Sequence, residues 1–408
     1  MNAPRSSPAV VDSDRHEAPA RPSSGTVIWV EPRLSAPSGG TVYNDRVIAA
    51  LADHGLEVHR VDVSAAWPRP DETARHAVHA QLSAVRDRLG SHPVVVDGLV
   101  GGGMPELFSS DSAVGQADDR ADDGARPVAD VLLVHLPLAV DAGPDSDRLN
   151  AAEGRAVRQA RRVVATSRWA AEEIRRRHGR RDVEVISPGV TRPASDPGSG
   201  RGSCREVGFE AGAGIGADAA ADAGAAPALR PPRLAMAASF TPRKNHRLLG
   251  DALEPLLDRG WTLQLAGPGA ETPEGASVLS ELRRRLPGRV DHRGALTPEA
   301  MPGFWEHADL VLLPSWAETF GMVVTEACVH GVPGIVSAGT GAEEALGEAG
   351  AACDPGSPEA WTAQLRAWLD GPTLRRRWAE TARTRADRLP PWTRTAAAWQ
   401  TLIRSVDR

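Results

Sequence analysis

The sequence predicts an α/β protein built from two doubly wound, Rossmann-like halves that face each other across a cleft. Short apolar runs alternate with helical patterns, which is typical of crossover units around a parallel sheet. This alternation occurs twice along the chain, and a stretch rich in Gly and Ala separates the two series. The 408 residues fit two or three domains at roughly 150 residues each.

Composition excludes several classes of function. The chain is 41% hydrophobic and 25% charged, as in globular proteins, and its net charge of −6 argues against a general electrostatic grip on nucleic acid. The longest apolar stretch, residues 128–140, is shorter than the roughly 20 residues that cross a bilayer. No basic start leads into an apolar segment, so we expect neither a signal peptide nor a transmembrane segment. Three scattered cysteines fit a reducing, cytoplasmic location.

The first half is predicted to form a domain over residues 25–193, after a disordered tail at 1–24. Its apolar runs are too short for typical helices and suit buried strands. The expected strands are 26–30, 57–61, 93–96, 128–134, 162–165 and 182–186, and the expected helices include 43–54, 72–89 and 169–178. A polar, Asp-rich stretch at about 109–127 interrupts this rhythm and is predicted to be a mobile insert.

The second domain is predicted over residues 231–390, after a low-complexity linker at 194–230. No strand leads into the glycines of that linker, so we reject a phosphate loop there. The expected strands are 233–237, 261–266, 289–292 and 310–313, and a helix with an apolar face around 248–257 is expected to stop at Gly260. The last segment, 391–408, carries Trp and Leu at helical spacing and is predicted to be a terminal helix.

The most informative segment is 315–336, which follows the strand at 310–313. Glu318 falls in the connecting loop and Glu326 in a short helix that begins near Met322. A helix start offers free N–H groups and a partial positive charge to phosphate, and Gly321 lets a ligand approach the backbone. Carboxylates repel phosphate and instead accept hydrogen bonds from hydroxyls. Either glutamate alone would be read as a solvated acid, but together they predict a nucleotide-sugar site.

Arg243 and Lys244 follow the strand at 233–237 and precede a helix, so they can reach the same cleft. Adjacent cations there would neutralise a diphosphate, Arg in a bidentate manner and Lys as a point charge. The alternative is a pair of solvated cations, which the positive end of a helix disfavours. Lys244 is the only lysine among the 47 basic residues, which weakens that alternative further.

The first half contributes weaker candidates. Gly39 and Gly40 precede a helix near Thr41 and could present N–H groups to phosphate, although most glycine pairs are simple turns. His135 stands at the carboxyl end of a strand. This position is equally consistent with a catalytic role and with a structural role. The DxD at 145–147 is more consistent with a helix N-cap than with a metal ligand. No P-loop, HExxH or Cys/His cluster occurs, so we expect no metal and no cofactor.

These motifs resemble retaining glycosyltransferases of the GT-B fold, specifically family 4 (the group 1 type). The resemblance rests on the E-x7-E motif from Glu318 to Glu326, on RKN at 243–245 and on DPGSPEAWTAQLRAWL from Asp354. SGGTVYN, VVVDGLV and VHLPL in the first half are weaker family features. The resemblance implies metal-independent transfer of a hexose from a nucleoside-diphosphate sugar to an acceptor hydroxyl, with retention of anomeric configuration.

The resemblance also implies roles for individual residues. In such enzymes the first glutamate of the motif contacts donor-sugar hydroxyls, the second contacts the ribose, and the loop between them faces sugar and phosphates. The basic pair binds the diphosphate, the first-half histidine lies near the sugar, and the glycine loop lies near phosphate and acceptor. The terminal helix, here 391–408, packs back on the first domain. In this sequence the first glutamate is Glu318 and the second is Glu326, and the loop between them contains Phe320, Gly321, Met322 and Val323. The basic pair is Arg243 and Lys244, the histidine is His135, and the glycine loop is Gly39 with Gly40. In one departure, Ala238 and Ser239 stand where many members carry a Gly–Arg pair.

The sequence is also compatible with other functions. A nucleotide-sugar epimerase or phosphorylase can share this architecture, and Ser239 favours a degenerate partner that binds nucleotide sugars without activity. A dinucleotide-dependent oxidoreductase is disfavoured, because no strand is followed by G-x-G-x-x-G with an acid about 20 residues on. The donor's base and sugar are not specified, nor is the acceptor, which could be a glycan, a lipid or a small molecule. Peripheral membrane contact is compatible with the sequence.

Overall fold

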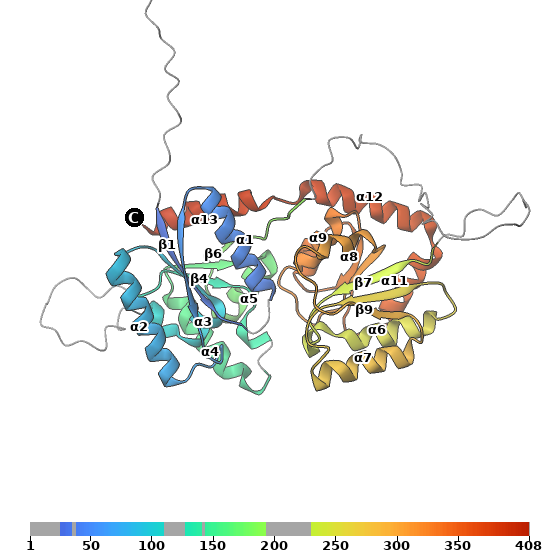
Figure 1. Ribbon diagram of the computed structural model, residues 1–408, viewed down its shortest axis with the longest axis horizontal. Helices are drawn as coiled ribbons and strands as arrows, with labels where there is room; N and C mark the ends of the chain where they lie inside the picture. Colours follow the sequence, from blue (N-terminus) through green and yellow to red (C-terminus); the bar gives the residue numbers. More distant parts are fainter. Residues whose placement is uncertain (1–24, 35–37, 110–126, 141–142, 193–229, 408) are drawn as a thin grey trace, which may run out of the picture.

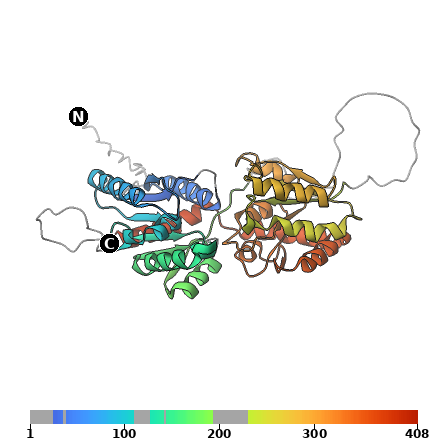
Figure 2. The same ribbon diagram turned by 90° about the horizontal axis from the view of Figure 1, so that it is seen from below.

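The computed structural model describes residues 25–34, 38–109, 127–140, 143–192 and 230–407, and it consists of two α/β lobes side by side (Figures 1 and 2). The expected tail at 1–24 and almost all of the insert at 109–127 and the linker at 194–230 lie outside these residues. In the described part of the chain, no helix is both long and apolar enough to cross a membrane.

The first lobe contains a parallel six-stranded sheet in the order β2-β1-β3-β4-β5-β6. Its inner strands are runs of Val and Leu buried on both faces, as parallel sheets between helical layers require. The strands are β1 Thr26–Pro32, β2 Glu57–Val63, β3 Val94–Asp97, β4 Val131–Val134, β5 Arg162–Ala165 and β6 Val183–Val185. The helices are α1 Gly39–Asp53, α2 Glu72–Leu89, α3 Gly98–Gly103, α4 Ser146–Gln159 and α5 Arg168–His178.

The second lobe contains another parallel six-stranded sheet, in the order β12-β11-β10-β7-β8-β9. Its strands are β7 Arg233–Ala237, β8 Thr262–Ala266, β9 Val290–His292, β10 Leu310–Leu313, β11 Gly334–Ser337 and β12 Gly350–Cys353. Its helices are α6 His246–Leu253, α7 Pro273–Arg285, α8 Met301–Glu306, α9 Met322–Val329, α10 Ala342–Leu346, α11 Pro358–Asp370 and α12 Pro372–Arg388. Strands β7 and β10 are neighbours, which brings the loops that follow them to one edge of the sheet.

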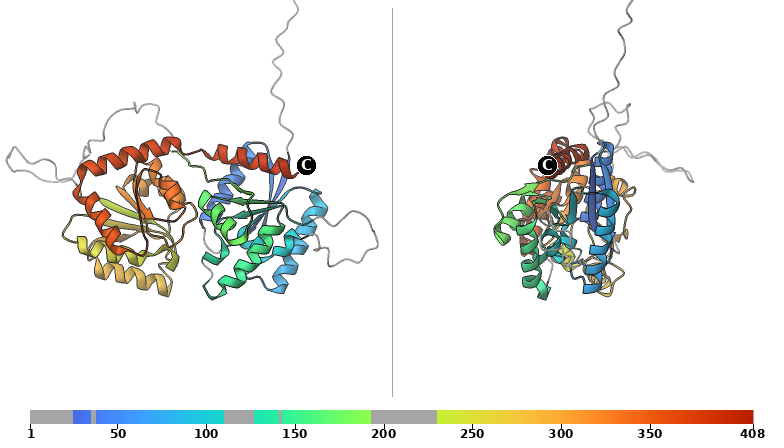
Figure 3. Two further views of the ribbon diagram at one scale, coloured as in Figure 1. Left: turned by 180° about the vertical axis from the view of Figure 1, so that it is seen from behind. Right: turned by 90° about the vertical axis from the view of Figure 1, so that its left-hand side faces the viewer.

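The last helix, α13 Trp392–Val406, leaves the second lobe and packs on α1 of the first, so that α12 and α13 together run along both lobes (Figure 3). The rings of Trp29 and Trp399 meet edge to face, with centroids 4.9 Å apart. The Trp399 indole N–H donates to the Tyr43 hydroxyl (2.9 Å), which in turn donates to the Ile186 carbonyl (2.8 Å). The only tyrosine in the chain therefore joins the C-terminal helix to the first sheet.

The helix boundaries differ from the sequence expectation at two places for physical reasons. Helix α1 begins at Gly39 rather than near Thr41, because the Ser38 hydroxyl caps it by accepting from the Thr41 N–H (3.2 Å). Helix α6 ends at Leu253 and does not reach Gly260, because Pro255 has no N–H to continue the ladder and a 3₁₀ turn, Glu254–Leu256, follows.

Two smaller expectations also need correction. Strand β4 starts at Val131 and not at 128. Asp145 stands at the N-cap position of α4, but its carboxylate makes no capping hydrogen bond and instead pairs with Arg69 at 2.7 Å.

Candidate active site

A cavity of about 500 Å³ lies between the two lobes and is lined by residues from both. The lining includes the residues that follow β1, β3 and β4 in the first sheet and those that follow β7 and β10 in the second. These are carboxyl ends of parallel strands, where ligands bind in open α/β sheets. Ten of the predicted site residues line it, namely Gly39, Gly40, His135, Arg243, Lys244, Glu318, Phe320, Gly321, Met322 and Val323.

The Lys244–Glu318 pair forms the centre of the second-lobe wall. The Lys244 ammonium lies 2.5 Å from Oε2 of Glu318, and both side chains are largely buried. The Ser315 hydroxyl donates to the same carboxylate (3.4 Å). The two segments that the sequence singled out separately, 74 positions apart, therefore meet in one cluster.

Arg243 ties the same two loops together through the backbone. Its guanidinium donates to the Ala317 carbonyl (2.9 Å), and the Trp316 N–H donates to the Arg243 carbonyl (2.8 Å). Arg243 is thus held at the cavity wall by a main-chain carbonyl and Lys244 by the Glu318 carboxylate, which reduces the entropy cost of ordering the two cations when a ligand binds.

The electrostatics of Glu318 follow from this arrangement. Burial by itself raises the pKa of the carboxyl, but the charges of Lys244 and Arg243 outweigh burial and bring the pKa below its usual value. Glu318 is therefore an ionised acceptor of hydrogen bonds at neutral pH, as recognition of sugar hydroxyls would require.

The start of α9 supplies the backbone donors of the site. Gly321 adopts a φ of 82°, which favours glycine, and a Cβ there would lie a tight 3.2 Å from a Leu313 methyl. In the described residues no side chain caps this helix, so its first N–H groups are available to a ligand. Met322 reaches the first lobe, where a Cβ on Gly39 would lie 3.7 Å from its terminal methyl carbon.

Glu326 lies one turn further along α9 and is half-buried. It is not among the residues that line this cavity. Burial raises the pKa of its carboxyl, and the Trp305 indole and the charge of Arg46 only partly oppose this. A contact between Glu326 and a ribose remains a prediction.

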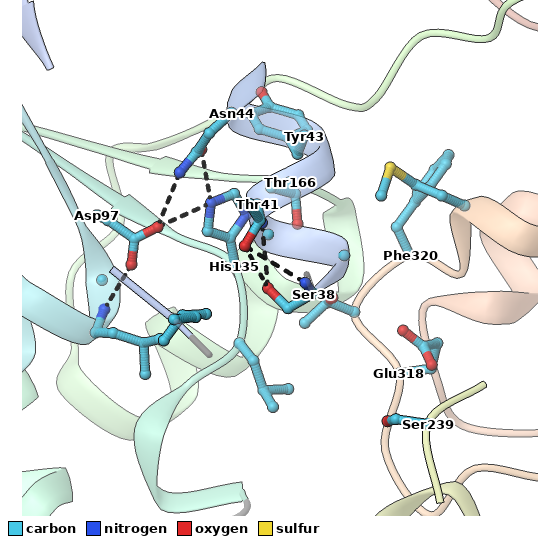
Figure 4. Close-up of a pocket in the computed structure, with 18 of the residues that line it drawn as sticks. Ser38, Thr41, Tyr43, Asn44, Asp97, His135, Thr166, Ser239, Glu318 and Phe320 are labelled. Carbon is cyan, nitrogen blue, oxygen red and sulfur yellow. Dashed lines mark hydrogen bonds and ion pairs between the residues drawn. The ribbon is translucent and has the colours of Figure 1, made fainter. Parts of the chain in front are cut away.

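On the first-lobe wall, a polar network surrounds His135 (Figure 4). Nε2 of His135 lies 3.0 Å from Oδ1 of Asn44 and 3.2 Å from Oδ2 of Asp97. The Asn44 amide also donates to Asp97 (3.2 Å) and to Glu31 (3.0 Å), and Arg60 pairs with Glu31. Sequence reasoning missed Asn44, Asp97 and Glu31. The sequence signal that could have identified the two acids is their position, because Glu31 lies near the end of the buried strand β1 and Asp97 ends the buried strand β3.

Ser239 also lines the cavity, at a position where the resemblance leads one to expect arginine. The cations on the described second-lobe wall are Arg243 and Lys244. Within the described residues, no three His, Cys, Asp or Glu side chains are grouped so as to hold a metal ion. The site thus combines a cationic, N–H-rich wall in the second lobe with hydrogen-bonding side chains in the first.

Comparison with known proteins agrees with this geometry. Residues 222–385 match the family model described as glycosyl transferases group 1. A D-inositol 3-phosphate glycosyltransferase of Corynebacterium glutamicum is 31% identical over 179 residues, which are 41% of this chain and 42% of that protein. A glycogen synthase of Mycobacterium tuberculosis is 33% identical over 34% of each chain. The matched segments thus span less than half the length of these relatives.

Solved structures resemble almost the whole chain in fold. A sucrose-phosphate synthase from Thermosynechococcus elongatus superposes with a TM-score of 0.69 at 17% identity, covering 94% of this chain and 99% of its own. HepE from Anabaena, solved with UDP and glucose, gives a TM-score of 0.65 at 16% identity over 93% and 100% of the two chains. The chain therefore has the GT-B fold, and its residues 222–385 match the group 1 glycosyl transferases.

Proposed function

We propose that this protein is a retaining hexosyltransferase that moves a hexose from a nucleoside-diphosphate sugar to an acceptor hydroxyl without a metal ion. The Lys244–Glu318 pair beside the start of α9 is the observation that carries this proposal. It places a cation, an ionised hydrogen-bond acceptor and free backbone N–H groups around one cavity wall. A ligand that uses all three has both phosphates and sugar hydroxyls.

The same groups suit the charge that develops during transfer. As the bond from the anomeric carbon to the phosphate oxygen breaks, negative charge builds on the leaving diphosphate. Lys244, Arg243 and the N–H groups near Met322 are fixed donors for that charge, the role that a metal ion takes in other folds. In the proposed front-face attack, the acceptor hydroxyl oxygen bonds to the anomeric carbon on the face that the diphosphate leaves, and the hydroxyl proton passes to the leaving phosphate oxygen. This gives retention at the anomeric carbon, so Glu318 needs no nucleophilic role.

The reaction needs water to be excluded from the cleft. The acceptor would enter from the first lobe, and closure of the lobes would bring its hydroxyl beside the anomeric carbon. Glu318 would accept hydrogen bonds from the sugar, and His135 lies on the opposite wall. By their names, the relatives given above are a D-inositol 3-phosphate glycosyltransferase and a glycogen synthase, which supports a hydroxyl-bearing acceptor.

The test is a panel of nucleoside-diphosphate hexoses and hydroxyl acceptors, with the anomeric configuration of the product read by proton NMR. We expect a retained anomer and a rate that EDTA leaves unchanged. An inverted product, or a rate abolished by EDTA and restored by a divalent ion, would contradict the proposal.

Ser239 on the cavity wall favours a second candidate, a nucleotide-sugar-binding partner without activity. An epimerase of the same fold is the other alternative. Donor incubated alone separates these outcomes, because an epimerase converts it without an acceptor. An inactive partner binds the donor, which raises the melting temperature by mass action, yet yields no product with any acceptor.

A further inference from the structure

His135 is held from one side by two side chains that both reach the same ring nitrogen. Nε2 lies 3.0 Å from Oδ1 of Asn44 and 3.2 Å from Oδ2 of Asp97 (Figure 4). Asn44 is 1% exposed and Asp97 is 3% exposed, so their geometry is set by the protein and hardly at all by solvent.

The orientation of the Asn44 amide decides what Nε2 must do. Its Nδ2 donates to Oε2 of Glu31 (3.0 Å) and to Oδ2 of Asp97 (3.2 Å), and a carboxylate oxygen can only accept. The carbonyl oxygen of Asn44 therefore faces His135. Both atoms opposite Nε2 are acceptors, so Nε2 carries the hydrogen.

A neutral imidazole has one N–H, and here it is used on Nε2. Nδ1 then holds a lone pair. Within the described residues Nδ1 has no hydrogen-bond partner, while the ring lines the cavity and the side chain stays 17% exposed. Nδ1 is thus prepared to accept a hydrogen bond and not to donate one.

Further contacts make this arrangement rigid. The other carboxylate oxygen of Asp97 accepts from the Leu99 N–H (2.9 Å) at the start of α3. Glu31 is held by Arg60. Asp97 is therefore fixed by the start of α3. Asn44 is fixed by Glu31, which is itself held in an ion pair with Arg60.

We propose that Asp97 and Asn44 are positioning residues that hold His135 as its Nε2–H tautomer, so that Nδ1 accepts a hydrogen bond from a substrate hydroxyl. This inference rests on the proposed function, because it assigns the hydroxyl to the sugar donor or to the acceptor in the same cavity. It gives Asp97, which is 3% exposed, a role that acts through His135.

Asp97→Asn is the decisive variant. It keeps the oxygen that caps α3 but presents an NH₂ group to Nε2, which favours the Nδ1–H tautomer. In protein labelled with ¹⁵N-histidine, the wild-type Nδ1 signal should be that of an unprotonated nitrogen, and the His135→Gln spectrum identifies it. Asp97→Asn should shift that signal toward a protonated nitrogen and lower kcat at least about tenfold. The donor KM should rise as well if the hydroxyl belongs to the sugar, and stay unchanged if it belongs to the acceptor.

Asp71→Asn is the matched control, because Asp71 caps α2 by accepting from the Ala74 N–H (2.8 Å) and does not line the cavity. It makes the same chemical change at the same kind of position. It should leave the His135 signal and kcat as in the wild type.

Ligand additions identify the hydroxyl. A change of the Nδ1 shift on adding donor alone assigns it to the sugar, and a change only after an acceptor is added assigns it to the acceptor. A protonated Nδ1 in the wild type, no response to either ligand, or an Asp97→Asn variant with unchanged tautomer and kcat would overturn the inference. A wild type with the expected tautomer that transfers no sugar would instead count against the proposed function.

Discussion

The imidazole of His135 packs directly against Gly40, and a Cβ on that glycine would come within 3.0 Å of the ring. Gly40 is the second residue of α1, where alanine would ordinarily be the better helix former. The site therefore retains a helix-weakening residue to make room for the histidine.

Gly40→Ala should consequently lower kcat while leaving the free energy of unfolding nearly unchanged. The gain in helix propensity is about 1 kcal/mol at most, so the free energy of unfolding should change little. The displaced ring should lower kcat severalfold. Gly39→Ala offers a comparison, because its Cβ meets only the Met322 methyl at an ordinary 3.7 Å. Steady-state kinetics of both variants would show the larger loss for Gly40→Ala, and equal losses would contradict the steric explanation.

Lys244→Ala should reduce turnover by about 100-fold or more, because a fixed donor to the leaving diphosphate is lost. It also leaves the buried Glu318 without its nearest cation, at a cost of about 3 kcal/mol, with the fold retained in circular dichroism. The double variant Lys244→Ala/Glu318→Gln should recover part of that stability but none of the turnover. Arg247→Ala, which breaks an exposed pair with Glu281, is the control and should leave both quantities near wild type. Sugar transfer by Lys244→Ala at a near-normal rate would refute the assignment.

Features that depend on local sequence patterns were predicted well, whereas contacts that depend on which strands are neighbours in the sheet were not. Ten of the twelve described strands were predicted, because buried parallel strands are continuous apolar runs such as Leu310–Leu313; β11 and β12 were missed. It was predictable that Lys244 and Glu318 lie in one cleft, because both follow such runs and the carboxyl ends of parallel strands share an edge; their ion pair was not predicted.

The Asn44–Asp97 contact could not be found in the same way. It joins residues 53 positions apart and depends on β1 lying directly beside β3, an adjacency that no local pattern encodes. The early end of α6 could have been read from Pro255, since a proline inside a helical pattern ends the helix.

Tyr43→Phe should destabilise the first lobe by about 2 kcal/mol, because it leaves the Trp399 indole N–H and the Ile186 carbonyl buried without their shared partner. Chemical denaturation would measure this. If the hydrogen bond carries the effect, adding Trp399→Phe to Tyr43→Phe should cost less than the sum of the single variants. Strict additivity would show that the two side chains are not coupled.

Stability should fall in mild acid through His246. Burial lowers the pKa of this histidine to about 4 from 6.5, helped by the charges of Lys244 and His292. Between these values the unfolded chain binds the proton and the folded chain does not, so stability is lost as pH falls from 6.5 toward 4. At about 1.4 kcal/mol per pH unit, the loss by pH 5 is about 2 kcal/mol.

The comparison that isolates this effect is the free energy of unfolding at pH 7.5 and pH 5 in the wild type and in His246→Asn. The difference between the two pH values should be smaller in the variant by about that amount. An identical difference in both proteins would exclude His246 as the source.

We expect Lys244, beside Glu318 and the start of α9, to bind the diphosphate of a nucleotide donor. Calorimetric titration of nucleoside diphosphates into the wild type and Lys244→Ala measures this binding. The Kd for the preferred diphosphate should rise at least about tenfold in the variant, a loss of about 1.4 kcal/mol, while the corresponding monophosphate is affected less. An unchanged diphosphate Kd in a folded Lys244→Ala protein would contradict it.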